Sequence, residues 1–269
     1  MRRRLLELPA LFCIFMPDMK KFLISAALCL LGISGLCRAA GSFPLDSLKT
    51  DSEGYYILFD GTSFNGWRGY GKDSVPTVWT ISDGCLEYDK APGCTKGDII
   101  FDHEFEDFEL RFDWKVTKGA NSGMFIHARE IESVDGSICP MFMTAPEYQI
   151  RDNDIPEASV LKGHQSGSLY DMIPADPQNA NEVGEWNTGA IRVRHGKVTF
   201  FQNGVPVTKF DLRSKKWIRM LEDSKFSSSK SPEAFGILSR CGAKGYAGYI
   251  GIQDHGRKVY YRNIRVKPL

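Results

Sequence analysis

Three short segments of the sequence alternate aliphatic residues with side chains that could hydrogen-bond a polar ligand. They are NSGMFIHA (121–128), EYQIR (147–151) and YIGIQDH (249–255). Because successive side chains of a β-strand point to opposite faces, each segment predicts one apolar face and one face available for chemistry. The residues on the second face are Asn121, Gly123, Phe125, His127, Glu147, Gln149, Arg151, Gly251, Gln253 and His255.

The side chains on this second face suit a ligand that carries many hydroxyl groups. Amides such as Gln149 and Gln253 both donate and accept hydrogen bonds. Phe125, and Trp186 in GEWN, could offer a ring face to the C–H surface of a sugar. A solvated sheet of chance composition is the alternative interpretation, because His127 alone is more often a structural histidine.

Other classes of catalytic site leave no trace in the sequence. It contains no GxSxG nucleophile elbow, no HExxH zinc motif and no glycine-rich phosphate loop. A carboxylate pair for ordinary glycoside hydrolysis could be drawn from Glu147, Asp152, Asp154 and Glu185, but sequence does not fix the spacing that this mechanism needs. From the residues alone, the favoured hypothesis is a concave surface on these three strands that hydrogen-bonds a polar ligand.

The elements that must position these residues are mainly short strands. FELRFDWKV (108–116) alternates strictly, and turns at 195–197, 203–204 and 255–257 predict hairpins. One segment, 211–226, has helical spacing of Leu212, Trp217 and Leu221. Many strands with one short helix predict an all-β fold, an antiparallel β-sandwich. The sequence has no repeat of 20–50 residues, which disfavours a propeller.

The start of the chain predicts export rather than structure. Residues 1–39 contain a basic flank, an apolar run from Phe22 to Leu36 and small residues at Ala39 and Ala40, as in a secretory signal peptide. Met19 is an alternative start, which would make 1–18 an extension, and acylation of Cys37 is a less favoured alternative. We therefore expect a mature start near Ala40 or Gly41, a periplasmic or secreted location, and no membrane span in the mature chain.

Charge and length limit the remaining possibilities. The chain has 34 basic and 33 acidic side chains, and loss of residues 1–39 removes six and two of them, leaving a slightly acidic protein. The sequence contains no cluster of basic residues, so we do not expect a nucleic-acid partner. We expect a flexible segment at 40–54 and a single domain at 55–269. Disulfide pairing among Cys85, Cys94, Cys139 and Cys241 stays open, and the long irregular segment 128–144 is a candidate functional loop.

Ten motifs in a fixed order resemble one known family. They are LFDGTSFNGWRG, DFELRFDWKV, NSGMFIH, EYQIRDND, GSLYD, GEWN, FQNGVPV, DSKF, GYIGIQDHG and YRNIRVKPL. The chain resembles the 3-keto-disaccharide hydrolase family between Tyr55 and Leu269. The resemblance implies a concanavalin A-like lectin/glucanase jelly roll with its site on the concave face. Two positions depart from the family pattern: His127 stands where Arg is usual, and Arg151 where an aliphatic residue is usual.

The resemblance implies an exported hydrolase or lyase that cleaves 3-keto-glycosides. A ketone at carbon 3 acidifies the hydrogen at carbon 2, so a base can start elimination of the aglycone, and water then adds. The candidate acids and bases are His255, Glu147 and His127. The candidate substrate-binding residues are Asn121, Phe125, Gln149, Arg151, Tyr170, Trp186 and Gln253.

Two further questions are left open by the sequence. No cofactor is certain, but a divalent metal could stabilise the enolate, with His255, Glu147 and Asp152 as ligands. The alternative function is a noncatalytic carbohydrate-binding protein, since jelly rolls of this kind include pure binding modules. An ordinary endo-glycosidase of the same fold is a third hypothesis for the function.

Overall fold

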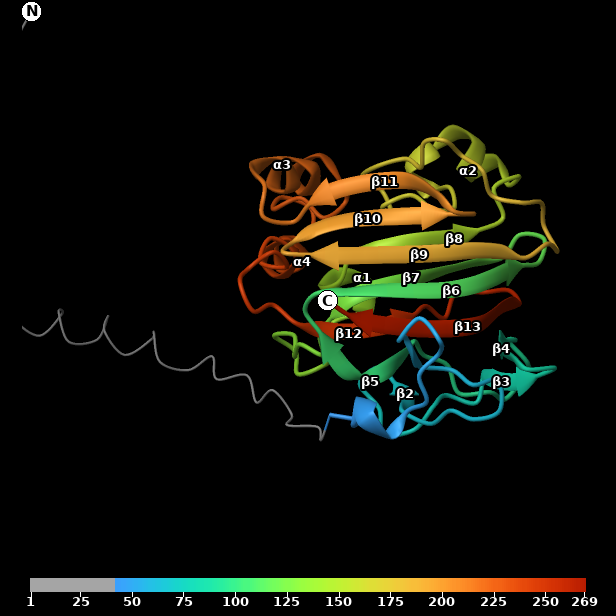
Figure 1. Cartoon of the computed structure of the whole chain (residues 1–269). Coiled ribbons are helices and arrows are strands. Elements are labelled where there is room, and N and C mark those ends of the chain that lie inside the picture. The colour runs from blue at the N-terminus through green and yellow to red at the C-terminus, as the bar shows by residue number, and fades with distance from the viewer. Residues whose placement is uncertain (1–41) are drawn as a thin grey trace, which may run out of the picture. The chain divides into compact units, whose positions relative to one another are not determined.

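The computed structural model describes residues 42–269, which form two antiparallel sheets packed face to face. Figure 1 shows the larger sheet in front, with β11, β10, β9, β6 and β13 running across the view, and the smaller sheet behind it. The predicted signal peptide, Cys37 and the predicted mature start at Ala40 or Gly41 lie outside the described residues. The predicted antiparallel β-sandwich is confirmed.

The large sheet has eight strands and the small sheet has five. The large sheet runs β11-β10-β9-β6-β13-β4-β3, with β1 also paired to β13, and the small sheet runs β2-β5-β12-β7-β8. The strands of the large sheet are β1 (Tyr56–Ile57), β3 (Trp79–Ser82), β4 (Cys85–Tyr88), β6 (Phe108–Val116), β9 (Asn187–Arg194), β10 (Lys197–Gln202), β11 (Val205–Asp211) and β13 (Val259–Pro268). Those of the small sheet are β2 (Trp67–Gly69), β5 (Ile99–Phe105), β7 (Asn121–Ala128), β8 (Glu147–Arg151) and β12 (Gly248–Ile252).

The core fills the space between the inner faces of the two sheets. Strand β6 supplies Phe108, Leu110, Phe112, Trp114 and Val116 to it, as the alternation predicts, and all five are buried. The small sheet contributes aliphatic residues and aromatic rings, among them Phe101, Phe105 and Tyr148. The Tyr148 ring meets that of Phe112 edge-on at 5.5 Å between centroids. These large aromatic side chains hold the two sheets together by burying apolar area.

The helices are short and lie outside the sandwich core. The predicted helix is present as α3 (Lys215–Asp223), and Ser214 caps it by accepting a hydrogen bond from the Trp217 N–H. Its Trp217 ring is buried and donates from Nε1 to the Leu238 carbonyl in α4 (Pro232–Leu238) at 2.9 Å. Sequence reasoning did not anticipate α4, α1 (Met141–Thr144), α2 (Pro156–Val160) or the 3₁₀ turns η1 (Leu45–Ser47) and η2 (Lys162–His164).

The N-terminal segment and the cysteines were two further points that the sequence raised. The described part of segment 40–54, expected to be flexible, packs against the sandwich: the Phe43 N–H donates to the Asp102 carbonyl, and its ring meets Phe101. The cysteines at 85, 94, 139 and 241 are all free thiols. No helix among residues 42–269 is long and apolar enough to cross a membrane.

A compact layer of chain covers the outer face of the small sheet, which faces away from the large one. Strand β8 is buried at all five positions, so both of its faces are covered. The cover includes the irregular segment 128–144 and α1, whose Met141 packs with Ile100 and Phe125 in a second, smaller apolar cluster. The site-bearing face of the small sheet is therefore screened from water.

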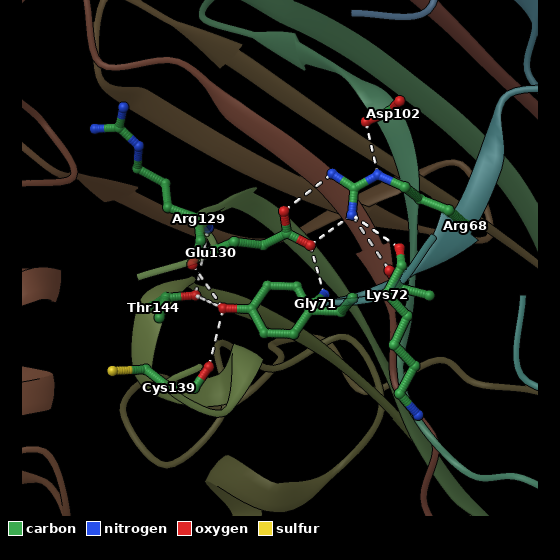
Figure 2. Close-up of polar contacts among 10 residues, drawn as sticks. Arg68, Gly71, Lys72, Asp102, Arg129, Glu130, Cys139 and Thr144 are labelled. Carbon is green, nitrogen blue, oxygen red and sulfur yellow. Dashed lines mark hydrogen bonds and ion pairs between the residues drawn. The ribbon is translucent and has the colours of Figure 1, made fainter. Parts of the chain in front are cut away.

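A network of polar contacts holds segment 128–144 against β2 (Figure 2). Arg68 donates to Glu130 from both terminal nitrogens and to Asp102 from Nε at 2.8 Å. Tyr70 donates to the Arg129 carbonyl at 2.6 Å, and its oxygen also lies near the Cys139 carbonyl. Because both partners of the Arg68–Glu130 pair are largely buried, this contact should contribute more than an exposed ion pair.

We expect the Arg68–Glu130 pair to stabilise the cover over the small sheet. Glu130→Ala should lower the free energy of unfolding by about 2–3 kcal/mol, because it leaves a buried guanidinium short of one partner. Glu132→Ala is the matched control, since Glu132 is exposed nearby in the same segment and should change stability by less than about 0.5 kcal/mol. Chemical denaturation measures both, and equal effects would contradict the assignment.

Candidate active site

Gly123 lies at the centre of the candidate site, on the outer face of the small sheet. Gln149 is its direct partner on β8, and the Gln253 N–H donates to its carbonyl from the other side at 3.0 Å. The side chain of Glu147 lies over it, because a Cβ added to Gly123 would meet Glu147 Oε1 at 2.2 Å. Glycine is therefore required here to make room for a carboxyl group.

Glu147 is a buried acid without a salt-bridge partner. It is 5 % exposed, and within residues 42–269 its oxygens accept no hydrogen bond and form no ion pair. Burial raises the pKa of Glu147 to about 8; the ammonium of Lys225 opposes the increase, the carboxylate of Asp98 adds to it, and Arg151 opposes it. Such a carboxyl group keeps its proton at neutral pH, as general acids do.

Asp98 is a second acid with a raised pKa on the same face. It comes directly before β5, with the parity of Ile100, whose side chain packs in the outer cluster. Burial raises the pKa of Asp98 to about 6. The Asp254 N–H donates a hydrogen bond to Asp98 Oδ1, and this bond acts to lower the same pKa. In the strand order β5-β12-β7, the end of β12 with Gln253 lies between Asp98 and Gly123.

An open cleft of about 590 Å³ reaches Asp98 from the surface. Its walls come from the loop after β2, the residues just before β5, the cover segment and the loop after β12; they include Tyr70, Lys72, Pro140, Met141 and Asp254. Small-molecule sites typically occupy about 300–1,000 Å³. Glu147 does not itself line this cleft, but the charge of Asp98 raises the pKa of Glu147, so the two carboxyl groups interact electrostatically.

Two amides on the site face have unused hydrogen-bonding capacity. Asn121 Oδ1 and Gln253 Oε1 are buried and have no hydrogen-bond partner within residues 42–269. A buried polar atom without a partner costs about 1–3 kcal/mol, so such atoms in a native structure call for an explanation. A bound ligand that donates hydroxyl hydrogens would satisfy both.

A cation and aromatic rings border the Glu147 side of the site. The Tyr170 N–H donates to the Glu147 carbonyl at 3.1 Å, which fixes the backbone of Tyr170 beside this acid. The Lys225 ammonium lies 4.3 Å from the centre of the Tyr170 ring and 4.9 Å from that of Phe142. Burial lowers the pKa of Lys225, while the carboxylates of Glu147 and Asp171 counteract the change.

A histidine held by two carboxylates supports Tyr170. His164 is buried, with Nδ1 at 3.1 Å from Glu157 Oε1 and Nε2 at 3.0 Å from Asp171 Oδ1. Its ring lies 4.7 Å from that of Tyr170. Arg151 contacts Glu157 at 3.3 Å, and so the predicted binding residue Arg151 belongs to this ionic chain beside the site.

The structure brings six predicted residues to the outer face of the small sheet and leaves His255 in a different setting. They are Asn121, Phe125, Glu147, Gln149, Arg151 and Gln253. Gln149 Oε1 accepts the Ile150 N–H, so part of its capacity is used by the backbone. His255 lies in the exposed loop between β12 and β13.

The placement predicted for His127 is wrong. Strand β7 contains one extra residue opposite β12, since Tyr249 pairs with Ala128 but Gly251 pairs with Phe125. His127 takes a φ of 58° at this bulge, which breaks the alternation. Its ring is buried against Phe108, and Nε2 bonds the Glu106 carbonyl at 2.8 Å. His127 therefore lies in the core and not on the site face.

Two aromatic residues predicted to contact sugar are also placed elsewhere. Phe125 does face outward, but it is fully buried beneath Met141 and Ala145, so its ring offers no surface to a ligand. Trp186 lies against the outer face of the large sheet, with the Arg262 guanidinium 3.9 Å from its ring centre. The room at Gly251 is likewise filled, by the sulfur of Met141.

The predicted metal ligands do not come together. Both oxygens of Asp152 accept backbone N–H groups, Oδ2 from Gly119 at 2.7 Å and Oδ1 from Asp154 at 2.9 Å, so this side chain shapes a turn. Across residues 42–269, no three His, Cys, Asp or Glu side chains are grouped closely enough to hold a metal ion. The residues present do not fit the proposed metal site.

Sequence reasoning missed Asp98, His164, Asp171 and Lys225. Asp98 could have been found by extending the alternation of β5 one step backward from Ile100. Lys225 and Asp171 stand in the quoted motifs DSKF and GSLYD, but no periodicity indicates where these loops fold. His164 occupies a turn whose position depends on tertiary contacts alone.

The burial of Glu147 generates a test based on stability. The unfolded chain releases the Glu147 proton near its ordinary pKa of 4.5, whereas the folded protein keeps it up to about 8. The unfolded state thus binds fewer protons between these values, and stability falls as pH rises through this window. Glu147→Gln removes that loss, so its melting temperature should exceed that of the wild type by a margin that is larger at pH 8 than at pH 5.

The control for this test is Glu104→Gln, at an exposed position of β5. Its margin over the wild type should not change between the two pH values. A Glu147→Gln margin that is the same at pH 5 and pH 8 would show that this carboxyl group titrates normally.

Comparison with known proteins places the chain in a family. The model of the 3-keto-alpha-glucoside-1,2-lyase-like domain matches residues 54–267. The 3-keto-disaccharide hydrolase of Bacteroides thetaiotaomicron VPI-5482 is 49% identical over 239 residues, which cover 84% of this chain and 82% of that protein.

Solved structures agree with this comparison. A crystal structure from Parabacteroides distasonis ATCC 8503, provisionally assigned as a glycosyl hydrolase, has a TM-score of 0.68 at 28% identity and covers 81% of this chain and 95% of its own. A second structure from the same organism has a TM-score of 0.57 at 24% identity, covers 76% and 100% of the two chains, and supports the fold alone. The chain belongs to the family of the 3-keto-alpha-glucoside-1,2-lyase-like domain.

Proposed function

We propose that this protein cleaves 3-keto-disaccharides by elimination followed by addition of water, with Asp98 and Glu147 as its acid–base pair. The relative that is 49% identical is a 3-keto-disaccharide hydrolase, which supports a glycoside-cleaving hydrolase here. The observation that carries the mechanism is a half-buried carboxyl group, Asp98, beside a buried one, Glu147, whose pKa values are raised to different levels, about 6 and about 8. Such separation assigns the two groups opposite proton-transfer roles.

The chemistry begins at carbon 2 of the oxidised sugar. The ketone at carbon 3 acidifies the neighbouring hydrogen, and a carboxylate can remove it as a proton to leave an enolate. The enolate expels the aglycone from carbon 1, and the leaving oxygen takes a proton. Water then adds at carbon 1 and carbon 2 is reprotonated, so the net reaction is hydrolysis.

Each acid has the protonation state that one of these steps requires. At neutral pH Asp98 is mainly ionised and can act as the base, while Glu147 is mainly protonated and can donate to the leaving oxygen. A sugar ring over Gln253, between the two acids, would donate hydroxyl hydrogens to the unpaired amide oxygens there and at Asn121. The Lys225 ammonium would favour negative charge that develops on this side of the site.

The candidates from sequence are therefore reordered. Glu147 keeps a catalytic role as the acid, and Asp98 takes the role of base in place of His255. Tyr170 and Arg151 lie on the Glu147 side of the site as positioning residues, in contact with His164 and Glu157 respectively. No step is assigned to a metal ion, because the oxygens of Asp152 are already occupied by backbone donors.

Export is a separate proposal, which rests on the composition of the first residues. The apolar run after Lys20 and Lys21 and the small residues that follow favour cleavage near Ala40 or Gly41. N-terminal sequencing of the secreted or periplasmic protein should find this start. A mature chain that begins at Met1 or Met19 would contradict cleavage, and an acylated Cys37 would instead support a lipoprotein.

The acid–base assignment predicts a bell-shaped pH dependence of kcat/KM on a 3-keto-disaccharide, rising near pH 6 and falling near pH 8. Asp98→Asn and Glu147→Gln should each lower turnover by about 10²-fold or more. Activated aryl 3-keto-glycosides, whose leaving group needs no proton, should restore Glu147→Gln but not Asp98→Asn. Glu104→Gln should retain wild-type rates, as a change of an exposed acid on β5.

Isotopes and unoxidised sugars complete this experiment. Deuterium at carbon 2 should slow cleavage wherever proton removal limits the rate, and the unoxidised parent disaccharide should remain intact. Equal cleavage of oxidised and unoxidised substrates would remove the elimination mechanism in favour of an ordinary glycosidase. Binding without product from either sugar would identify a carbohydrate-binding module.

A further inference from the structure

A second hollow, of about 350 Å³, lies on the outer face of the large sheet. Its floor is Ala190, which pairs with Arg111 on β6 and with Phe201 on β10. The guanidinium groups of Arg111, Arg192 and Arg265 line it. It shares no residue with the cleft beside Asp98 and belongs to the other sheet, so the proposed reaction leaves it without a role.

Hydrogen-bond donors exceed free acceptors in this hollow. Its buried acid, Glu109, already accepts from the Tyr55 hydroxyl at 2.6 Å, from Arg111 Nε at 3.0 Å and from Arg192 Nε at 2.7 Å. These donors hold the pKa of Glu109 below its usual range, against the effect of burial. Glu109 is therefore a fixed anion that orients two arginines and has little capacity left for a ligand.

The remaining acid of the lining is partly occupied. Asp113 accepts at Oδ2 from Asn263 Nδ2 at 2.7 Å and from Arg262 Nε at 3.2 Å, and only its Oδ1 accepts no hydrogen bond from residues 42–269. By contrast, Arg111 Nη2 and Arg192 Nη1 make no hydrogen bond to any of residues 42–269, and the Arg192 side chain is 53% exposed. A ligand that fits must bring acceptors, and a carboxylate matches the fork of an arginine better than a neutral hydroxyl does.

Beside these donors the hollow has an apolar surface. Phe201 is half-buried on β10, with its ring centre 5.7 Å from the Arg192 guanidinium, and the Ala190 methyl group lies next to it in the strand order. An aromatic face beside planar donors suits a ring with a C–H surface and polar edges. The volume is at the lower end of about 300–1,000 Å³, the range of small-molecule sites, which suits one or two sugar units better than a peptide segment.

We propose that this hollow is a binding site for an acidic saccharide, which places a uronic acid carboxylate on Arg192 and Arg111 and its ring on Ala190 and Phe201. The site holds a glycan on the sheet opposite the reaction cleft. It does not depend on the proposed reaction, because none of its residues contacts the Asp98–Glu147 site. Substitutions here should leave the cleavage of small 3-keto-disaccharides unchanged.

The test is titration of the mature protein with sodium glucuronate, glucose and sodium sulfate, followed by calorimetry or NMR. Ala190→Leu fills the hollow without a change of charge, and Arg192→Gln removes one guanidinium. Arg194→Gln is the matched control, since Arg194 is exposed on the same face of β9 two residues along but does not line the hollow. Circular dichroism checks that each variant folds.

Glucuronate should bind the wild type and Arg194→Gln equally, and its Kd should rise at least tenfold in Ala190→Leu and in Arg192→Gln. Glucose should bind at least tenfold more weakly than glucuronate, and Glu147→Gln should leave glucuronate binding unchanged. Wild-type affinity in both hollow variants, or loss of binding in Glu147→Gln, would overturn the site. Sulfate that binds as tightly as glucuronate would overturn the saccharide assignment and leave a simple anion site.

Discussion

The burial of a carboxyl group on the outer face of the small sheet is the constraint on which the candidate site depends. Glu147 can lie flat over Gly123 only because position 123 has no side chain. Its pKa reaches about 8 only because a layer of loops and short helices removes water from that face. A carboxyl group on an uncovered sheet would titrate near 4.5 and would serve only as an anion.

The cover is therefore part of the chemistry as well as part of the fold. The Arg68–Glu130 contact and the Tyr70 hydroxyl fix segment 128–144 to β2 with charged and polar groups that are themselves largely buried (Figure 2). The same segment leads into α1, whose Met141 occupies the space above Gly251. What remains open is the cleft that reaches Asp98, so solvent and substrate approach this acid from one side.

Local alternation predicts the sandwich because every long strand has one face in a common core. FELRFDWKV supplies its five apolar residues to that core without exception. The same rule fails at His127, where one extra residue in β7 and a φ of 58° reverse the facing direction. A bulge depends on the partner strand, and nothing in NSGMFIHA marks it.

The candidate site likewise contains some residues that strand alternation predicts and others that it does not. Glu147, Gln149, Asn121 and Gln253 follow from strand parity, and the structure gathers them around Gly123. His164, Asp171 and Lys225 come from loops whose positions are set by tertiary contacts, such as the bond from the Lys225 N–H to Asp171 at 2.8 Å. Phe125 was placed on the correct face, but sequence could not show that α1 would cover it. Parity predicts direction, whereas exposure depends on the rest of the chain.

The most direct measurement of the central claim is the ionisation of Glu147 itself. Infrared difference spectra between the wild type and Glu147→Gln, recorded as a function of pH, report the protonated C=O stretch of this one carboxyl group. We expect the band to be present at pH 6 and to disappear with a midpoint near 8. A band that is already absent at pH 6, with a midpoint near 4.5, would contradict the assignment of Glu147 as a buried acid.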